Sequence, residues 1–182
     1  MVLLFLAEGF EEIEVITTAD IVRRAGLELE LVSVTGTRLI KGAHGITVMA
    51  DTIFRKCRLP ECRMMVLPGG MPGTKNLAYH DGLKKALTQH YTAQRHIAAI
   101  CAAPSILGSI GLLEGVDATC YPGFEHLLTG ANFVSATPVV HDRKIITANG
   151  PAVAPEFALE IVKSLLGAEK MLEVKRGMNF KM

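Results

Sequence analysis

The chain passes from a short apolar run into a segment of helical period within the stretch Ile97-Ala98-Ala99-Ile100-Cys101-Ala102-Ala103-Pro104-Ser105-Ile106-Leu107. Cys101 stands at the junction, with one alanine two positions before it and another two positions after it. A sharp strand-to-helix turn that exposes a nucleophile has room only for small side chains at those two positions. The stretch therefore predicts a reactive Cys101 between a buried strand and a helix. The alternative is that Cys101 is a small buried hydrophobe within an apolar strand.

On both sides of this stretch, apolar runs bounded by turn residues alternate with segments of helical period. That alternation is typical of a mostly parallel sheet with helices on both faces, and it predicts an α/β fold. We expect strands at residues 2–7, 27–34, 64–67, 97–101 and around 118, hairpins at 39–49 and 139–147, and helices at 11–25, 74–93, from Cys101 to Leu113, and from Asn149-Gly150-Pro151 to about Gly167. Ile13, Ile16, Ile21 and Val22 are expected on one side of the first helix. The tail after Ala168 is expected to be either a last helix or a loose segment.

The composition limits the kind of protein this can be. A chain of 182 residues can bury a core without metals or disulfides, and we expect one domain over residues 1–182. Nineteen lysines and arginines stand against 18 aspartates and glutamates, for a net charge of +1. Neither nucleic acid nor an anionic membrane is indicated as a partner. A small molecule or another protein is the expected partner.

The N-terminal segment 1–7 has no basic leader and meets Glu8 after too few apolar residues for a signal core or a membrane span. We therefore expect a cytoplasmic protein. Glu11 and Glu12, at the start of the first helix, are expected on its solvated face. The cysteines match no zinc template and are expected to be free thiols, with no metal bound; they are Cys57, Cys62, Cys101 and Cys120.

Three segments are expected to meet at the carboxyl edge of the sheet, where open α/β sheets bind ligands. The first strand leads into Glu8–Glu14, the strand at 64–67 into Pro68-Gly69-Gly70, and the elbow strand into Cys101. A thiol at the start of a helix faces unpaired N–H groups, which predicts a lowered pKa and a reactive sulfur. An N–H of the double glycine, together with that of Ala102, could form an oxyanion hole, although the glycines fit an ordinary turn equally well.

Several blocks of the sequence resemble the DJ-one/PfpI superfamily, in particular the branch of the Parkinson-disease protein deglycase and its bacterial relatives. The blocks are Ala7–Glu14 (AEGFEEIE), Arg23–Gly26 (RRAG), Val66–Gly70 (VLPGG), Ala98–Pro104 (AAICAAP), Asn149–Pro151 (NGP) and Glu156–Leu159 (EFAL). They fall in order between residues 2 and 167, so the resemblance covers nearly the whole chain. It implies a flavodoxin-like three-layer sandwich with a mostly parallel central sheet, a homodimer, and chemistry without a cofactor.

The resemblance also implies roles for individual residues. Cys101 is implied to be the nucleophile and an oxidation-sensitive thiol. Glu14 is implied to be a protonated carboxyl group that hydrogen-bonds with the sulfur, because an ionised Glu14 would repel a thiolate. The oxyanion N–H groups match Gly70 and Ala102. Peptidase branches of the superfamily carry a histidine at the position of Ala102, which argues against a Cys-His peptidase.

The remaining pocket positions are Gly69, Arg24, His44, Tyr121, Gly150 and Pro151. Arg24 matches a basic residue that lines an anion-binding pocket, and His44 stands where the human member has a cross-dimer arginine. Tyr121 replaces the site histidine of that member, which would be a natural proton shuttle. A tyrosine with an ordinary pKa of ~10 is a poor base, so Glu14 becomes the better proton carrier. Whether Tyr121 or His126 takes the place of the histidine stays open.

Three functions from different classes follow. In an enzyme, Cys101 would attack the aldehyde of methylglyoxal or glyoxal, or of their adducts, and Glu14 would help the hemithioacetal rearrange to a hydroxy acid without glutathione. This is the glyoxalase III or deglycase chemistry that the resemblance implies. An oxidation sensor or redox-regulated chaperone would instead hold Cys101 as a sulfinate. A plain binding module would keep an inert cysteine that alkylates slowly at pH 7. We favour the enzyme, with a small aldehyde or a glycated molecule as its substrate.

Overall fold

The computed structural model describes residues 1–180. Its strands are β1 (Val2–Leu6), β2 (Leu29–Ser33), β3 (Leu39–Lys41), β4 (Thr47–Met49), β5 (Thr52–Ile53), β6 (Met64–Leu67), β7 (His96–Ile100), β8 (Asp117–Ala118), β9 (Asn132–Phe133), β10 (Val139–Asp142) and β11 (Ile145–Ala148). Its α-helices are α1 (Glu12–Arg24), α2 (Gly73–Ala78), α3 (Asp81–Thr92), α4 (Pro104–Ser109), α5 (Ala154–Leu166) and α6 (Ala168–Gly177). Single 3₁₀ turns are η1 (Phe54–Lys56), η2 (Leu59–Glu61), η3 (Glu125–Leu127) and η4 (Pro151–Val153).

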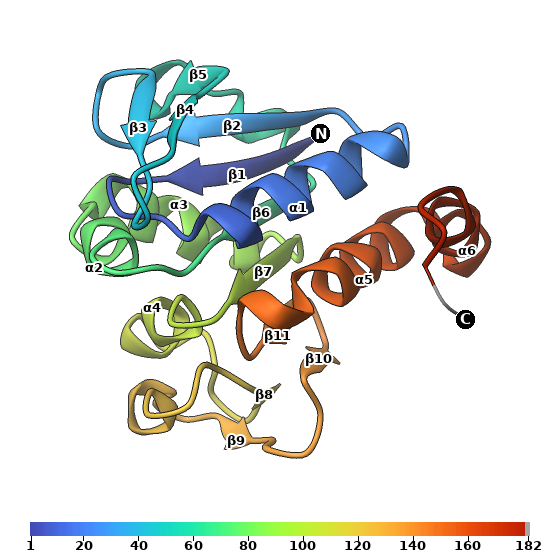
Figure 1. The fold of residues 1–182 in the computed structure, drawn as a ribbon. Helices are drawn as coiled ribbons and strands as arrows, with labels where there is room; N and C mark the ends of the chain where they lie inside the picture. The colour runs from blue at the N-terminus through green and yellow to red at the C-terminus, as the bar shows by residue number, and fades with distance from the viewer. Residues whose placement is uncertain (181–182) are drawn as a thin grey trace.

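Seven strands form one sheet in the order β10-β11-β7-β6-β1-β2-β5, with helices on both of its faces (Figure 1). Neighbouring strands of this sheet are parallel except for the pair β10 and β11. The ribbons β3-β4 and β8-β9 lie outside it. The predicted α/β fold with a mostly parallel central sheet is therefore confirmed, as are the two hairpins, which are β3-β4 and β10-β11.

The alternation of side chains along β1 divides the core into two halves. Val2, Leu4 and Leu6 pack with buried residues of α1, α5 and α6. Leu3 and Phe5 pack in the other half with buried residues of α2, α3 and α4. All five side chains of β1 are completely buried, as expected for a central strand of a parallel sheet that is covered on both faces.

Helix α1 presents a different face to the core than its sequence predicted. Ile21 and Val22 are buried as expected, but Ile13 and Ile16 are 55% and 47% exposed. The buried stripe contains Val15 instead, together with small residues, because positions 13 and 16 fall on the side of the helix opposite to position 22 at 100° per residue. The expectation that all four apolar residues share one side is wrong.

The other differences are at helix ends. The helix expected at 74–93 is two helices, α2 and α3, because the chain breaks at Tyr79 and His80 and the His80 side chain caps α3 by accepting the Leu83 N–H at 2.9 Å. Helix α4 ends at Ser109 rather than at Leu113. The tail after Ala168 forms α6; Lys181 and Met182 lie outside the described residues.

Strands β1, β6 and β7 lie next to one another and run in the same direction. Their carboxyl ends therefore meet at one edge of the sheet. Three loops from distant parts of the sequence start there: the one that leads from β1 into α1, the double glycine after β6, and the turn at Cys101 after β7.

Candidate active site

Cys101 occupies a strained turn between β7 and α4. Its φ is +63°, in the left-handed region that residues other than glycine rarely adopt. The turn is fixed on both sides, because the Cys101 N–H donates to Ala148 O at 2.8 Å and the Tyr121 N–H donates to Cys101 O at 2.8 Å. Ala99 and Ala103, two positions to either side, are completely buried. This is the local geometry of a nucleophile elbow, which holds a side chain out from the tip of a strand.

The double glycine after β6 approaches the elbow so closely that side chains are excluded. A Cβ at Gly69 would lie 2.6 Å from Cys101 Cβ and 3.0 Å from its Sγ. Gly70 has a φ of +88°, and a Cβ there would lie 2.3 Å from the Glu11 backbone nitrogen. The backbone N–H groups of Gly70 and Ala102 are close enough to the Cys101 sulfur to lower its pKa. Their role as an oxyanion hole stays a prediction.

Glu14 reaches the sulfur from α1. Its side chain is 1% exposed, its Oε2 accepts the Gly69 N–H at 2.6 Å, and it lies beside the Cys101 thiol. Burial raises the pKa of Glu14 to about 7, although the Gly69 N–H and the Cys101 thiol act in the opposite direction. Its Oε1 is buried and accepts no hydrogen bond from the described residues, which adds to the cost of the charged form. Near neutral pH the site therefore holds Glu14 both as the protonated acid and as the carboxylate.

The structure contradicts the expectation of a lowered thiol pKa. Burial, and then the negative charge of an ionised Glu14, raise the pKa of Cys101 to about 12, against the N–H groups of Gly70 and Ala102. Helix α4 begins only at Pro104 and is six residues long, so it contributes little to the field at the sulfur. The repulsion disappears whenever Glu14 holds a proton, and the two groups therefore share their protons as one coupled pair.

A cavity of about 210 Å³ opens onto Cys101. Its lining residues are Glu11, Gly70, Met71, Cys101, Ala102, Tyr121, Phe124 and Pro151. Glu11, Met71 and Phe124 line the cavity although they were not predicted as site residues. Met71 follows the double glycine and Phe124 comes three residues after Tyr121, so proximity in sequence was the available signal. Gly150 lies behind Tyr121: a Cβ there would be 3.3 Å from the Tyr121 ring.

Glu14, Gly69 and Gly150 do not line the cavity themselves but lie next to Cys101 or Tyr121, which do. Arg24, His44 and His126 are also absent from the lining. Arg24 ends α1, is exposed, and pairs with Asp20 at 2.6 Å. His126 is exposed in the turn η3. His44 lies in the β3-β4 turn and contacts the edge of the site only through Glu11 and Glu12.

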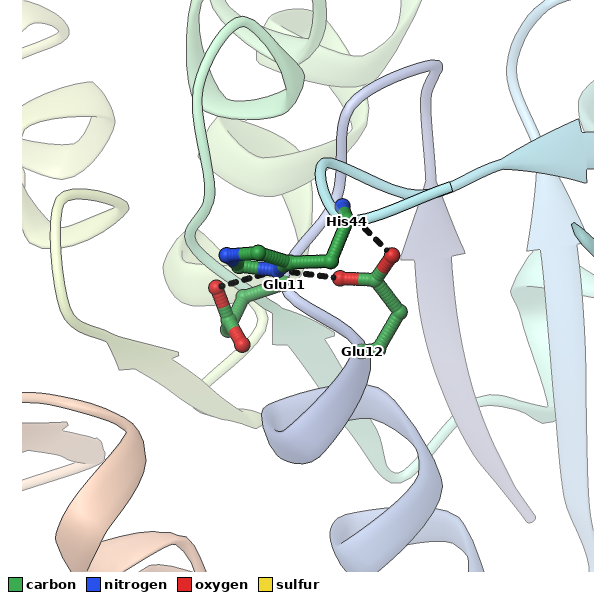
Figure 2. A group of neighbouring side chains, drawn as sticks. All are labelled: Glu11, Glu12 and His44. Carbon is green, nitrogen blue, oxygen red and sulfur yellow. Dashed lines mark hydrogen bonds and ion pairs between the residues drawn. The ribbon is translucent and has the colours of Figure 1, made fainter. Parts of the chain in front are cut away.

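Figure 2 shows this contact, in which the His44 ring lies between the carboxylates of Glu11 and Glu12. His44 Nδ1 is 2.9 Å from Glu12 and 3.6 Å from Glu11, and Glu12 Oε1 accepts the N–H groups of His44 and Ile46. Glu12 is 5% exposed, so the expectation of a solvated Glu12 is wrong: the carboxylate satisfies the turn of a ribbon that is distant in sequence. The hydrogen bond to Glu12 raises the pKa of His44.

These three side chains are also the candidate metal ligands of the site, because one ligand atom from each lies within 4.8 Å of the others. Glu12 already has a hydrogen-bond donor on both of its oxygens, which accounts for the cluster without an ion. The cysteines Cys57, Cys62, Cys101 and Cys120 are free thiols, as expected. None of the helices in residues 1–180 is long and apolar enough to cross a membrane.

Comparison with known proteins gives a consistent result. The DJ-1/PfpI family model matches residues 1–164. The chain is 34% identical to the Drosophila melanogaster protein dj-1beta, over 97% of this chain and 95% of that protein. It is also 34% identical to the Caenorhabditis elegans protein described as glutathione-independent glyoxalase DJR-1.2, over 90% of this chain and 87% of that protein. It is 37% identical to the Arabidopsis thaliana protein DJ-1 homolog B over 95% of its own length, but spans only 40% of that longer relative.

Solved structures agree with the sequence relatives. The crystal structure of Drosophila melanogaster DJ-1beta has a TM-score of 0.95 at 34% identity, and that of Toxoplasma gondii DJ-1, described as oxidized, has a TM-score of 0.94 at 32% identity. In both cases the likeness covers 100% of this chain and 98% of the other. The fold is thus shared over the whole chain with these proteins, and this chain belongs to the DJ-1/PfpI family.

Proposed function

We propose that the protein is a cysteine-dependent enzyme of the glyoxalase III or deglycase type. It acts on methylglyoxal or glyoxal, or on their adducts, and converts the aldehyde to a hydroxy acid without a cofactor. One observation carries the proposal: a buried acid with a pKa of about 7 lies beside the thiol of a strained elbow cysteine that opens onto a cavity. The Caenorhabditis elegans relative described as a glutathione-independent glyoxalase supports it.

The first step forms the bond between enzyme and substrate. Cys101 Sγ attacks the aldehyde carbon while its proton passes to the carboxylate of Glu14, which compensates for a thiol pKa that is raised rather than lowered. The carbonyl oxygen becomes an oxyanion beside the N–H groups of Gly70 and Ala102. Return of the proton from Glu14 to that oxygen gives the hemithioacetal.

The second step moves a proton between neighbouring carbons. Glu14 takes the proton from the carbon bonded to sulfur and an enediol forms. The proton then returns to the adjacent carbon, so that the former aldehyde carbon is oxidised and the former ketone carbon is reduced. Water hydrolyses the resulting thioester to the hydroxy acid and releases the thiol. A carboxyl group with a pKa of about 7 suits both directions of proton transfer near neutral pH.

The experiment that tests this proposal is a lactate assay with methylglyoxal. Cys101→Ser is expected to abolish lactate formation, because a serine hydroxyl in the same environment is a far weaker nucleophile. Cys57→Ser is the matched control, since Cys57 is a free thiol that lies outside the cavity. Full activity of Cys101→Ser would end the proposal.

The second candidate is an oxidation-sensing or redox-regulated chaperone role. The N–H donors at Gly70 and Ala102, together with a protonated Glu14, suit the oxygens of a cysteine sulfinate. The sulfinate forms when two molecules of hydrogen peroxide each transfer one oxygen to the sulfur and leave as water. Mild peroxide is expected to add two oxygens to Cys101 before the other thiols react, as seen by mass spectrometry. Modification at random among the cysteines would contradict this role.

The proposed assembly is a homodimer in the cytoplasm. Exposed apolar side chains of α1 and of the β3-β4 ribbon supply an apolar surface for a second copy; they are Ile13, Ile16, Leu39, Ile46 and Met49. Arg24 and His44, which do not line the cavity of the single chain, could then be contributed to the partner's site. Four free thiols suit a reducing compartment.

A further inference from the structure

The lining of the Cys101 cavity is of two kinds. The polar part consists of the thiol, Glu11 and the backbone at Gly70 and Ala102. The rest is apolar and consists of Met71, Tyr121, Phe124 and Pro151. Met71 and Tyr121 are among the most exposed large apolar residues of the described chain, at 53% and 45%. Exposed apolar side chains that border a cavity indicate a surface that a ligand covers.

The apolar wall is fixed before any ligand binds. The Tyr121 backbone is tied to the elbow through its N–H bond to Cys101 O, and its ring packs edge-on against Phe124 with the ring centres 6.5 Å apart. Behind the ring, Gly150 leaves only enough space for a hydrogen: a Cβ there would be 3.3 Å from the ring, closer than most real contacts. A wall that is already ordered loses little conformational entropy when it covers a substrate.

The cavity is larger than the smallest aldehydes need. Its volume of about 210 Å³ is large compared with the ~10–15 Å³ of such space that one water needs. Glyoxal has no side group with which to fill the apolar part. An aryl group on the carbon next to the aldehyde would contact Tyr121 and Phe124 while the aldehyde meets the sulfur.

We propose that Tyr121, with Phe124 and Met71, makes the enzyme select 2-oxoaldehydes that carry an aryl or branched alkyl group over glyoxal. Tyr121 is then a specificity-determining residue whose ring, not its hydroxyl, is used. This inference rests on the proposed function for its chemistry, but the preference of the cavity is measurable without turnover.

The first arm of the test compares kcat/KM for phenylglyoxal and glyoxal. Tyr121→Asn is expected to lower the phenylglyoxal-to-glyoxal ratio by about tenfold, the usual effect of losing one good apolar contact. Tyr121→Phe keeps the ring and is expected to keep the ratio. Tyr79→Asn, which changes an exposed tyrosine outside the cavity, is the matched control and also keeps it. An unchanged ratio in Tyr121→Asn would overturn the proposal.

The second arm separates this proposal from the proposed function. Alkylation rates at Cys101, measured by mass spectrometry and divided by the rates for free glutathione, are compared for N-phenyl iodoacetamide and iodoacetamide. We expect the aryl reagent to be the faster of the two, and Tyr121→Asn to remove the aryl advantage. If this pattern holds while Cys101→Ser keeps full lactate formation, the cavity preference stands and the proposed function fails. Equal relative rates for the two reagents would overturn the preference itself.

Discussion

At the scale of single residues, the chemistry of the site depends on one coupled pair of acids. Cys101 and Glu14 are both buried enough that each pKa is raised, to about 12 and about 7. Two buried groups that share protons in this way give macroscopic pKa values that belong to the pair. The proton needed at each step is therefore already in the site.

The raised pKa of Glu14 predicts how stability changes with pH. Because the folded protein holds this proton more tightly than the unfolded chain, stability falls as the pH rises from about 4.5 to about 7 and is level above that range. The rise in pKa corresponds to about 3 kcal/mol. Glu14→Gln keeps the acceptor for the Gly69 N–H but cannot ionise, so at pH 8 its Tm should exceed that of the wild type by roughly 6–12 °C.

The same comparison at pH 4 supplies the control for Glu14→Gln. There Glu14 is protonated in both states, and the two proteins should melt within a few degrees of each other. The variant should also lose about a hundredfold or more in methylglyoxal turnover, since it carries no transferable proton. A Tm difference that does not change between pH 4 and pH 8 would contradict the assignment of the pKa of about 7 to Glu14.

A second prediction at this scale concerns the close approach of Gly69. In Gly69→Ala the new methyl group would overlap Cys101 Cβ and Sγ, so the elbow must shift. We expect a loss of about 1–3 kcal/mol in stability and about a hundredfold in turnover. Gly177→Ala is the control, because a Cβ there meets nothing within 4 Å and alanine suits α6. Wild-type turnover in Gly69→Ala would show that the contact is unimportant.

At the scale of elements, the β3-β4 ribbon is held to the start of α1 by a carboxylate and by backbone hydrogen bonds. Glu12 accepts the His44 N–H and contacts the His44 ring (Figure 2), and it also accepts the Ile46 N–H. The Gly9 N–H donates to Lys41 O at 2.8 Å. Burial raises the pKa of Glu12, but the hydrogen bonds from the His44 ring and from the N–H groups of His44 and Ile46 together lower it further, so the pKa is below its ordinary value. This contribution to stability is present above the ordinary carboxyl range and is lost as the pH falls through the lowered pKa.

Removing that carboxylate should release the ribbon. We expect Glu12→Ala to lose roughly 2 kcal/mol and to increase hydrogen exchange and protease cleavage at residues 42–46, because the N–H groups of His44 and Ile46 lose their acceptor. His44→Gln keeps both backbone contacts and should leave residues 42–46 protected. Equal exchange in Glu12→Ala and the wild type would mean that other contacts hold the ribbon.

At the scale of the whole molecule, exposed apolar side chains occur on two elements that Glu12 connects. Ile13 and Ile16 are on α1, and Leu39, Ile46 and Met49 are on the β3-β4 ribbon. In the proposed homodimer these side chains are covered. The double variant Ile16→Glu with Met49→Glu should sediment as a monomer, since it places two charges in an apolar interface. Leu166→Glu, at an exposed apolar residue that ends α5, is the control. A monomeric wild type would contradict the assembly.

Much of this arrangement could be predicted from local patterns. The strand at β7, the elbow at Cys101 and the helix that carries Glu14 follow from apolar runs and small residues over a few positions. The break between α2 and α3 could not, because it depends on how the His80 side chain bonds to a backbone N–H. Glu12 also looked like a solvated residue, since nothing near it in sequence shows that a ribbon 30 residues later covers it.

The sequence by itself determined the order of most elements, the parallel sheet and the turn that places Cys101 at the end of a strand, because periodicity and turn chemistry are set by neighbouring residues. Only the tertiary structure decided the protonation of the site and the shape of its cavity. Both depend on how deeply Cys101 and Glu14 are buried and on which loops meet there, and the Gly69, Tyr121 and Pro151 that surround the sulfur come from three separate strand ends. Burial and contact of that kind arise between segments and are therefore absent from any single stretch of the chain.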